Sequence, residues 1–215
     1  MSERSWLAVL TVGVMATGCG GNTHPPVVSS EIAPSPPART GGRFLPPSLD
    51  DEWTRWIQGE WEGTGESNAG RGRGTAIFEL ALSGQFLIQR GRAEITELDP
   101  VYLKQHMHAS DEEIARFQRQ GYESLEVYTV DPVTGDILGF LFDNLRCVAT
   151  GRGRREGRRE TIEWQWRTGH RSTRITERAG DDRMVVIEET RQEDGSVMRD
   201  RGEMVRVGRR PADAR

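Results

Sequence analysis

The stretch GEWEGTG, residues 59–65, places one large ring among glycines and glutamates, and it decides the fold class. In an extended strand, side chains alternate between two faces, so Trp61, Gly63 and Gly65 share one face and the glutamates occupy the other. We expect the tryptophan to point into a core and the glutamates to meet water. Glycines beside the ring let the strand bend sharply or let another chain approach closely. The stretch therefore predicts the curved first strand of a β-barrel.

The rest of the chain repeats short strand patterns between turn residues. In TAIFELAL, residues 75–82, Ala76, Phe78, Leu80 and Leu82 share one face, and Ser83-Gly84 then predicts a tight turn. Further strand segments lie at 86–97, 123–130, 136–142, 146–153, 159–167, 171–179, 183–191 and 197–207. About ten strands joined by short turns predict an all-β, antiparallel up-and-down barrel or a sandwich.

Two segments have a helical pattern instead. SLDDEWTRWI, residues 48–57, predicts a short helix with Ser48 as its N-cap and a tryptophan-rich stripe that closes one end of the fold. SDEEIARFQRQG, residues 110–121, predicts a helix in which Ser110 and Glu113 form a capping box. We expect this second helix to be an insertion at one rim of the barrel.

The N-terminus has the pattern of a targeting segment, residues 1–19. Arg4 precedes an apolar run that is too short to span a bilayer, which is typical of a signal peptide. The sequence Ala-Thr-Gly-Cys ending at Cys19 resembles the lipobox of bacterial lipoproteins, although that pattern prefers leucine where Ala16 stands. The resemblance implies a diacylglycerol anchor on Cys19. An ordinary cleaved signal with a chance cysteine is the alternative. Gly20, which is not aspartate, favours the outer membrane, facing the periplasm, within the bacterial cell envelope.

The composition divides the remaining chain into three parts. Residues 20–47 are rich in proline, serine and glycine and predict a flexible tether. Residues 48–208 form the barrel domain, and residues 209–215 are expected to be a disordered tail. The net charge of −4 argues against a nucleic-acid partner, whose binding domain would be basic.

Three motifs in order resemble those of an uncharacterised bacterial lipocalin-like family with a calycin-type barrel. They are GEWEGTG at 59–65, SGQFL at Ser83–Leu87 and YTVDPVTGD at Tyr128–Asp136. The resemblance covers roughly Asp51 to Arg206, and the helical insertion departs from it. It implies a closed barrel with a central pocket, and it implies no assigned activity.

The sequence lacks the signatures of cofactor and catalytic sites. His106 and His108 resemble the beginning of a zinc site, but they lie in a segment expected to be an exposed loop without a third ligand. Nitrobindin-type barrels bind haem through a histidine near the last strands, and residues 183–207 contain none. No nucleophile elbow or phosphate loop is present. We therefore expect no metal, no cofactor and no enzymatic activity.

Cysteine and arginine patterns each have a structural interpretation that we favour. Cys147 lies in an apolar-flanked segment and is expected to be a buried, inert thiol. The run RGRREGRR, Arg152–Arg159, is expected to be the turn of a long hairpin. Its alternative is a basic patch for acidic headgroups or other phosphates.

Aromatic residues on the predicted strands suggest a ligand cavity. The candidates are Trp61, Phe78, Phe86, Phe140, Phe142, Trp164 and Trp166. Strand acids such as Glu188, Glu189 and Glu203 are expected to pair with Arg174, Arg199 or Arg201, some of them inside the barrel. We expect a barrel that binds a small apolar or amphipathic molecule. The alternative is a structural or protein-interaction module of the envelope, and the sequence leaves the oligomeric state open.

Overall fold

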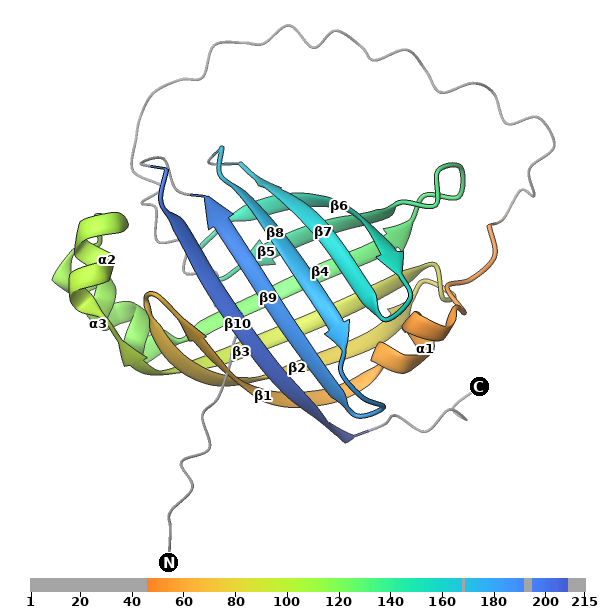
Figure 1. Cartoon of the computed structure of the whole chain (residues 1–215), viewed down its shortest axis with the longest axis horizontal. Coiled ribbons are helices and arrows are strands. Elements are labelled where there is room, and N and C mark those ends of the chain that lie inside the picture. The colour runs from red at the N-terminus through yellow and green to blue at the C-terminus, as the bar shows by residue number, and fades with distance from the viewer. Residues whose placement is uncertain (1–45, 168, 192–194, 209–215) are drawn as a thin grey trace, which may run out of the picture.

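The computed structural model describes residues 46–167, 169–191 and 195–208. Ten antiparallel strands close into one barrel in the order β1-β10-β9-β8-β7-β6-β5-β4-β3-β2 (Figure 1). The strands are β1 (Gly59–Ser67), β2 (Gly70–Ala81), β3 (Phe86–Leu98), β4 (Tyr122–Val130), β5 (Ile137–Asp143), β6 (Val148–Glu156), β7 (Arg159–Trp166), β8 (Arg171–Arg178), β9 (Arg183–Arg191) and β10 (Val197–Gly208). The predicted up-and-down barrel is confirmed, and the sandwich alternative is wrong because β1 pairs with β10.

Several predicted segments lie outside the described residues. They are the leader with Cys19, the tether up to residue 45 and the tail from residue 209. Within the described part of the chain, the helices are too short or too polar to cross a bilayer.

The first strand behaves as its sequence predicts. Trp61 is fully buried, and its indole Nε1 donates a hydrogen bond to the carbonyl of Ile57 at 2.8 Å. Gly63 lies so close to β10 that a Cβ there would stand 2.3 Å from the carbonyl oxygen of Glu203. The glycine therefore permits the close approach of the last strand, which closes the barrel.

Helix α1 (Glu52–Ile57) closes one end of the barrel, and its N-cap is Asp51 rather than Ser48. Asp51 accepts hydrogen bonds from the backbone and the hydroxyl of Thr54 at 2.9 and 2.7 Å. Ser48 does not cap the helix because the chain at that point is still bound to the β2–β3 turn, where Leu49 N donates to the Gly84 carbonyl. The tryptophans of α1 pack onto the main core, as predicted.

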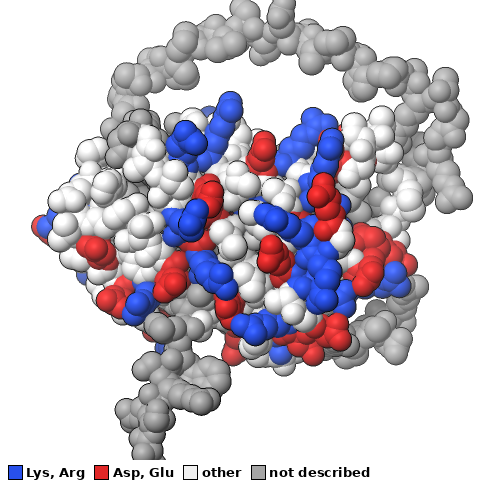
Figure 2. All heavy atoms as spheres, viewed as in Figure 1, with Lys and Arg blue, Asp and Glu red and all other residues white. Residues whose placement is uncertain are grey.

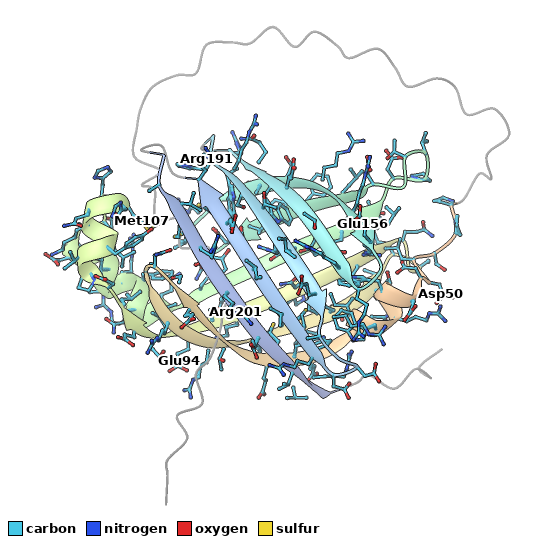
Figure 3. All side chains as sticks on the ribbon, in the orientation of Figure 1. Asp50, Glu94, Met107, Glu156, Arg191 and Arg201 are labelled. Atoms are coloured by element: carbon cyan, nitrogen blue, oxygen red, sulfur yellow. The ribbon has the colours of Figure 1, made fainter. Side chains whose placement is uncertain are left out.

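The insertion contains two helices where the sequence predicted one. Asp99 caps α2 (Pro100–His106), whose first residue is a proline, and α3 (Asp111–Gln120) has the predicted capping box. Both helices pack on a second apolar cluster that includes Met107 and Phe117. Met107 and Asp50 mark the two opposite ends of the barrel in Figure 3.

Strand β2 follows its predicted alternation until the chain turns. Ala76 and Phe78 are buried and Leu80 is half-buried, but Leu82 is 73% exposed. Leu82 has a φ of 49° in the β2–β3 turn, where the strand alternation has ended. Assigning Leu82 to the core face was therefore wrong.

Candidate functional site

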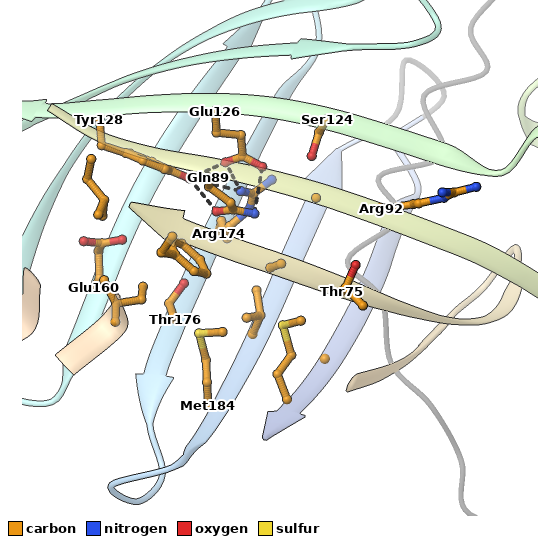
Figure 4. Close-up of a pocket in the computed structure, with 18 of the residues that line it drawn as sticks. Thr75, Gln89, Arg92, Ser124, Glu126, Tyr128, Glu160, Arg174, Thr176 and Met184 are labelled. Atoms are coloured by element: carbon orange, nitrogen blue, oxygen red, sulfur yellow. Dashed lines mark hydrogen bonds and ion pairs between the residues drawn. The ribbon is translucent and has the colours of Figure 1, made fainter. Parts of the chain in front are cut away.

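The barrel interior contains a cavity of about 80 Å³ between α1 and the middle of the strands (Figure 4). One part of its wall is apolar and includes Ile57, Phe78, Leu87, Met184, Val186 and Met204. The other part is polar and includes Gln89, Glu126, Tyr128, Glu160, Arg174 and Thr176. The cavity also reaches Thr75 and Arg92, a cross-strand pair that lines an outer groove as well.

Arg174 holds the polar wall together. Its Nη1 donates to Oε2 of Glu126 at 2.6 Å, and its Nε donates to Oε2 of Glu188 at 2.9 Å. Both glutamates are buried, so the arginine bridges two carboxylates that water does not reach. Burial opposes the charge of Arg174, but the two glutamates hold its pKa well above its usual value.

Further hydrogen bonds extend from both ends of this bridge. Tyr128 donates its hydroxyl proton to Glu126, and burial together with the nearby carboxylate raises the pKa of the Tyr128 phenol well above its usual value. Ser172 donates to Oε1 of Glu188 at 2.7 Å and accepts from Nε1 of Trp166 at 3.3 Å. A continuous chain of polar groups therefore crosses the barrel.

Asp200 lies beside this chain, between Ser67 on β1 and Glu188 on β9. It is fully buried, and its carboxyl oxygens make no hydrogen bond of good geometry with a described residue. Burial, and then the charge of Glu188, raises the pKa of Asp200 well above its usual value, and Ser67 on β1 offsets only part of this. Together with Glu126 and Glu188, Asp200 makes three buried carboxyl groups around the single guanidinium of Arg174.

A second ion pair lies at the α1 end of the cavity. Arg155 donates from Nε to Oε2 of Glu160 at 2.7 Å, and its Nη1 reaches both oxygens of Asp51. Burial raises the pKa of Glu160, although Arg155 opposes the effect. This arginine joins the barrel wall to the N-cap of the helix that closes it.

Four of the seven residues predicted to line the cavity point into the barrel: Trp61, Phe78, Trp164 and Trp166. Of these four, Phe78 contacts the cavity itself. Trp61, Trp164 and Trp166 are buried in the core around it. Trp164 rests on two glycines, because a Cβ on Gly139 or on Gly151 would stand 2.8 Å from its ring.

The other three phenylalanines lie on the outer face, so placing them in the cavity was wrong. Phe140 and Phe142 are 43% and 44% exposed, because Ile137 and Leu141 occupy the inner face of β5. Phe86 precedes the buried Leu87 and therefore takes the opposite face of β3. The sequence ILGFLF is apolar on both faces of β5, so alternation did not identify the inner one.

His106 and Cys147 lie where packing explains them: His106 contacts an aromatic ring, and Cys147 is buried. His106 ends α2 and stacks on Tyr102 with ring centroids 4.6 Å apart. The segment expected to be an exposed loop is therefore partly helical. Across the described residues, no three His, Cys, Asp or Glu side chains are arranged so that they could hold a metal ion. The burial predicted for Cys147 is confirmed, and its thiol lies 4.0 Å from the carbonyl oxygen of Leu145.

The acids and arginines that the sequence singled out are mostly paired. Glu188 faces inward and pairs with Arg174, whereas Glu189 and Glu203 pair with Arg199 and Arg183 near the surface. The run Arg152–Arg159 forms the predicted β6–β7 hairpin turn. Its Arg152 and Arg154 bind Asp136.

The sequence analysis missed Glu126, Gln89, Tyr128 and Asp200. One signal was available in YESLEVYTV, where Tyr122, Ser124, Glu126 and Tyr128 occupy alternate positions and so share a face. Both faces of that strand contain large side chains. The face with Tyr122, Glu126 and Tyr128 points into the barrel, and the apolar face with Leu125 and Val127 points outward.

The comparisons with known proteins show similarity to designed barrels. No protein-family model matches the chain, and no curated protein matches it. A redesigned β-barrel, mFAP1, bound to DFHBI is 10% identical, with 71% of this chain and 97% of that chain covered and a TM-score of 0.38. EF1p2_mFAP2b bound to DFHBI is 11% identical, covering 71% and 95%, with a TM-score of 0.37. A de novo designed fluorescence-activating β-barrel is 14% identical, covering 73% and 99%, with a TM-score of 0.34.

Proposed function

We propose that this chain is a non-catalytic binding protein whose barrel holds one small amphipathic molecule. The observation that supports this proposal is the divided wall of the cavity, which has Phe78, Leu87 and Met184 on one side and the Glu126–Arg174 bridge on the other. A molecule with a short apolar part and a polar head satisfies both sides. Met184 and Met204 are adaptable side chains that adjust to the shape of a ligand.

The cavity size limits the ligand. A volume of about 80 Å³ holds on the order of five water molecules, since each needs roughly 10–15 Å³ on this measure. Pockets for drug-sized ligands are larger, about 300–1,000 Å³. We therefore propose a ligand of a few non-hydrogen atoms in place of the long acyl chain that a wide barrel would accept.

The interior charge favours a head that donates hydrogen bonds. Glu126 and Glu188 place two carboxylates beside the one guanidinium of Arg174, and Asp200 adds a third carboxyl group, so a cationic or hydrogen-bond-donating head offsets the excess negative charge. A short alkylamine has this chemistry. A carboxylic acid of the same length adds a fourth acidic group.

We also propose that the barrel is held at a membrane of the bacterial envelope through a lipid on Cys19, with the outer membrane preferred. The lipobox-like sequence and the resemblance to lipocalin-like lipoproteins support this part of the proposal. In this arrangement the tether enters the barrel at Pro46, whose carbonyl accepts a hydrogen bond from Gln85 beside the β2–β3 turn.

The test compares matched ligands on one protein. The chain from Gly20 onward is titrated with butylamine and with butyrate, and the tryptophan emission and the heat of binding are recorded. Trp164, over whose ring Arg174 lies at 5.3 Å, is one of five tryptophans in the chain from Gly20 onward, so the heat of binding is the primary readout. We expect saturable binding of the amine and at least tenfold weaker binding of the acid.

A matched pair of variants locates the site. Glu126→Gln is expected to weaken amine binding at least tenfold, whereas Glu189→Gln, in an outer ion pair, leaves it unchanged. Native mass spectrometry after gentle purification supplies an unbiased check. A bare polypeptide mass, together with no saturable binding of either probe, overturns the proposal.

An interaction module of the envelope is the second candidate function. The specific observation that favours it is the outward position of Phe140 and Phe142, which leaves apolar surface on the outside of the barrel. Cross-linking that captures no protein partner, including a second copy, argues against it.

A further inference from the structure

One side of the barrel has an apolar outer surface that spans four strands. We define this outer apolar face by its residues: Ile88, Leu125, Val127, Leu138, Phe140, Phe142 and Val148. They are neighbours in the sheet, because Ile88 pairs with Val127, which pairs with Phe140. Leu125 likewise pairs with Phe142, which pairs with Val148.

The opposite side of the barrel has a different surface. Figure 2 shows arginine and acidic side chains interspersed over β8, β9 and β10. Ion pairs such as Arg199–Glu189 and Arg183–Glu203 cross neighbouring strands there. Exposed valines also occur there, at positions 197, 205 and 207 of β10, but they lie among charged side chains. The contiguous apolar face is therefore a property of β3–β6.

Strand β5 is apolar on both sides. Ile137 and Leu141 face the core, and Leu138, Phe140 and Phe142 face outward. Strands of this composition are normally covered on both faces. The three described helices lie at the two ends of the barrel and leave the outer side of β5 uncovered (Figure 1).

We propose that the outer apolar face is the contact surface of a homodimer, in which two copies stack β4 and β5 face to face about a twofold axis. A twofold contact is self-complementary, so the same patch serves both subunits. Sheets that stack in this way lie about 10 Å apart, and their side chains interdigitate. The proposal does not depend on ligand binding in the interior.

The charges at the rim of the face favour a second copy over an anionic membrane. Arg90 lies 3.7 Å from Glu79, and Arg92 lies 3.8 Å from Glu123. Arg152 is bound to the buried Asp136. Because these rim arginines are neutralised within the chain, two copies meet without like-charge repulsion, and anionic headgroups find little free positive charge to bind.

The area sets the expected strength of the dimer. Four strands about 4.8 Å apart, with two to three side-chain levels about 7 Å apart, cover on the order of 300 Å². A stable interface buries about 800 Å² on each partner. The apolar centre therefore needs the polar rim as well, and we expect a dissociation constant on the order of micromolar rather than nanomolar. Phe140, in the middle of the face, is the expected anchor.

The test measures self-association of the chain from Gly20 onward, which keeps every described residue and lacks the acylated cysteine. Sedimentation equilibrium from about 1 to 500 µM is expected to show a monomer–dimer equilibrium. Phe140→Asp is expected to weaken the dimer at least tenfold. Ile175→Asp, at an outward position on β8, is the matched control and should dimerise like the unchanged chain.

Folding of each variant is checked by its urea-unfolding midpoint. A chain that stays monomeric at the highest concentration overturns the proposal, and so does a folded Phe140→Asp variant that dimerises normally. If the monomeric chain instead floats with vesicles of phosphatidylethanolamine and phosphatidylglycerol, the face belongs to a lipid surface and the dimer is wrong. Loss of the dimer leaves the amine titration unaffected, so the two proposals fail separately.

Discussion

Asp200 on β10 stands directly opposite Glu188 on β9, and both carboxyl groups are inside the barrel with at most 1% of the residue exposed. Arg174 and Ser172 satisfy Glu188, whereas the carboxyl oxygens of Asp200 make no hydrogen bond of good geometry with a described residue. Two carboxyl groups in such a position do not both ionise readily, because each disfavours the charge of the other. The arrangement therefore favours the protonated form of Asp200.

This proton makes the stability of the barrel depend on pH. Because the folded pKa of Asp200 is raised, the folded chain retains a proton that the unfolded chain releases above about pH 4. The free energy of unfolding then falls as pH rises, by about 1.4 kcal/mol per unit, until the folded pKa is reached. Below about pH 4 both states are protonated and this contribution disappears.

Asp200→Asn removes that dependence. We expect the variant to match the unchanged chain near pH 4 and to be more stable by at least about 1 kcal/mol at pH 7. Urea denaturation at both pH values measures the difference, and Asp50→Asn, at an exposed position, is the control. A difference between variant and parent that stays constant from pH 4 to pH 7 would contradict the assignment of the proton.

Replacing Arg174 tests the bridge between the two glutamates. Arg174→Met leaves Glu126 and Glu188 buried without their cation, and we expect a loss of about 3–5 kcal/mol in the free energy of unfolding. Arg199→Met, in an exposed pair with Glu189, should cost less than about 1 kcal/mol. Adding Glu126→Leu and Glu188→Leu to Arg174→Met should restore part of the loss. Equal effects of the two arginine variants would show that the bridge is not important for stability.

The close packing of the Trp164 ring against Gly151 is tested by adding one methyl group at Gly151. A Cβ on Gly151 would lie 2.8 Å from both Ile162 and the Trp164 ring, so Gly151→Ala is expected to cost about 1–3 kcal/mol. Trp164→Phe in the same chain should reduce this cost, which a double-mutant cycle measures. Gly180→Ala, whose Cβ would meet Arg183 at an ordinary 3.6 Å, should change stability by less than about 0.5 kcal/mol.

The N-cap of α1 is Asp51 in the structure, whereas the sequence predicted Ser48, and two substitutions distinguish the two residues. Asp51→Ala removes the cap and the contact with Arg155, and we expect a cost of about 1–2 kcal/mol. Ser48→Ala should cost less than about 0.5 kcal/mol. Thermal unfolding of the two variants compares them directly. A larger effect at Ser48 than at Asp51 would reverse the assignment.

Patterns that depend on neighbours in the chain could be predicted from the sequence. The turn residues, the capping box at Ser110 and the burial of Trp61 each follow from a few adjacent residues. Alternation located β2 because its polar and apolar sides differ. It failed at β5 because ILGFLF has no polar side, so either face was equally able to enter the core.

The interior site depends on residues that the sequence separates widely. Glu126 and Arg174 are 48 positions apart, and Asp200 meets Glu188 only because β9 and β10 pair in one register. A charged residue on a strand normally indicates the solvent side. Inside this barrel the charge of Glu126 is stabilised by a partner that arrives through closure of the sheet.

The sequence by itself determined an antiparallel all-β fold of about ten strands, with its turns, its capped insertion and the inward tryptophan of GEWEGTG, because those features follow from local backbone preferences and period-two burial. Closure into a barrel depended on the pairing of β1 with β10. Only the tertiary structure decided which face of β4 and β5 turned inward. That choice placed Glu126 in the interior and Phe140 on the surface. Closure of the ten strands brings Arg174 on β8 across the interior to Glu126 on β4, and so sets the partner that this buried carboxylate can reach.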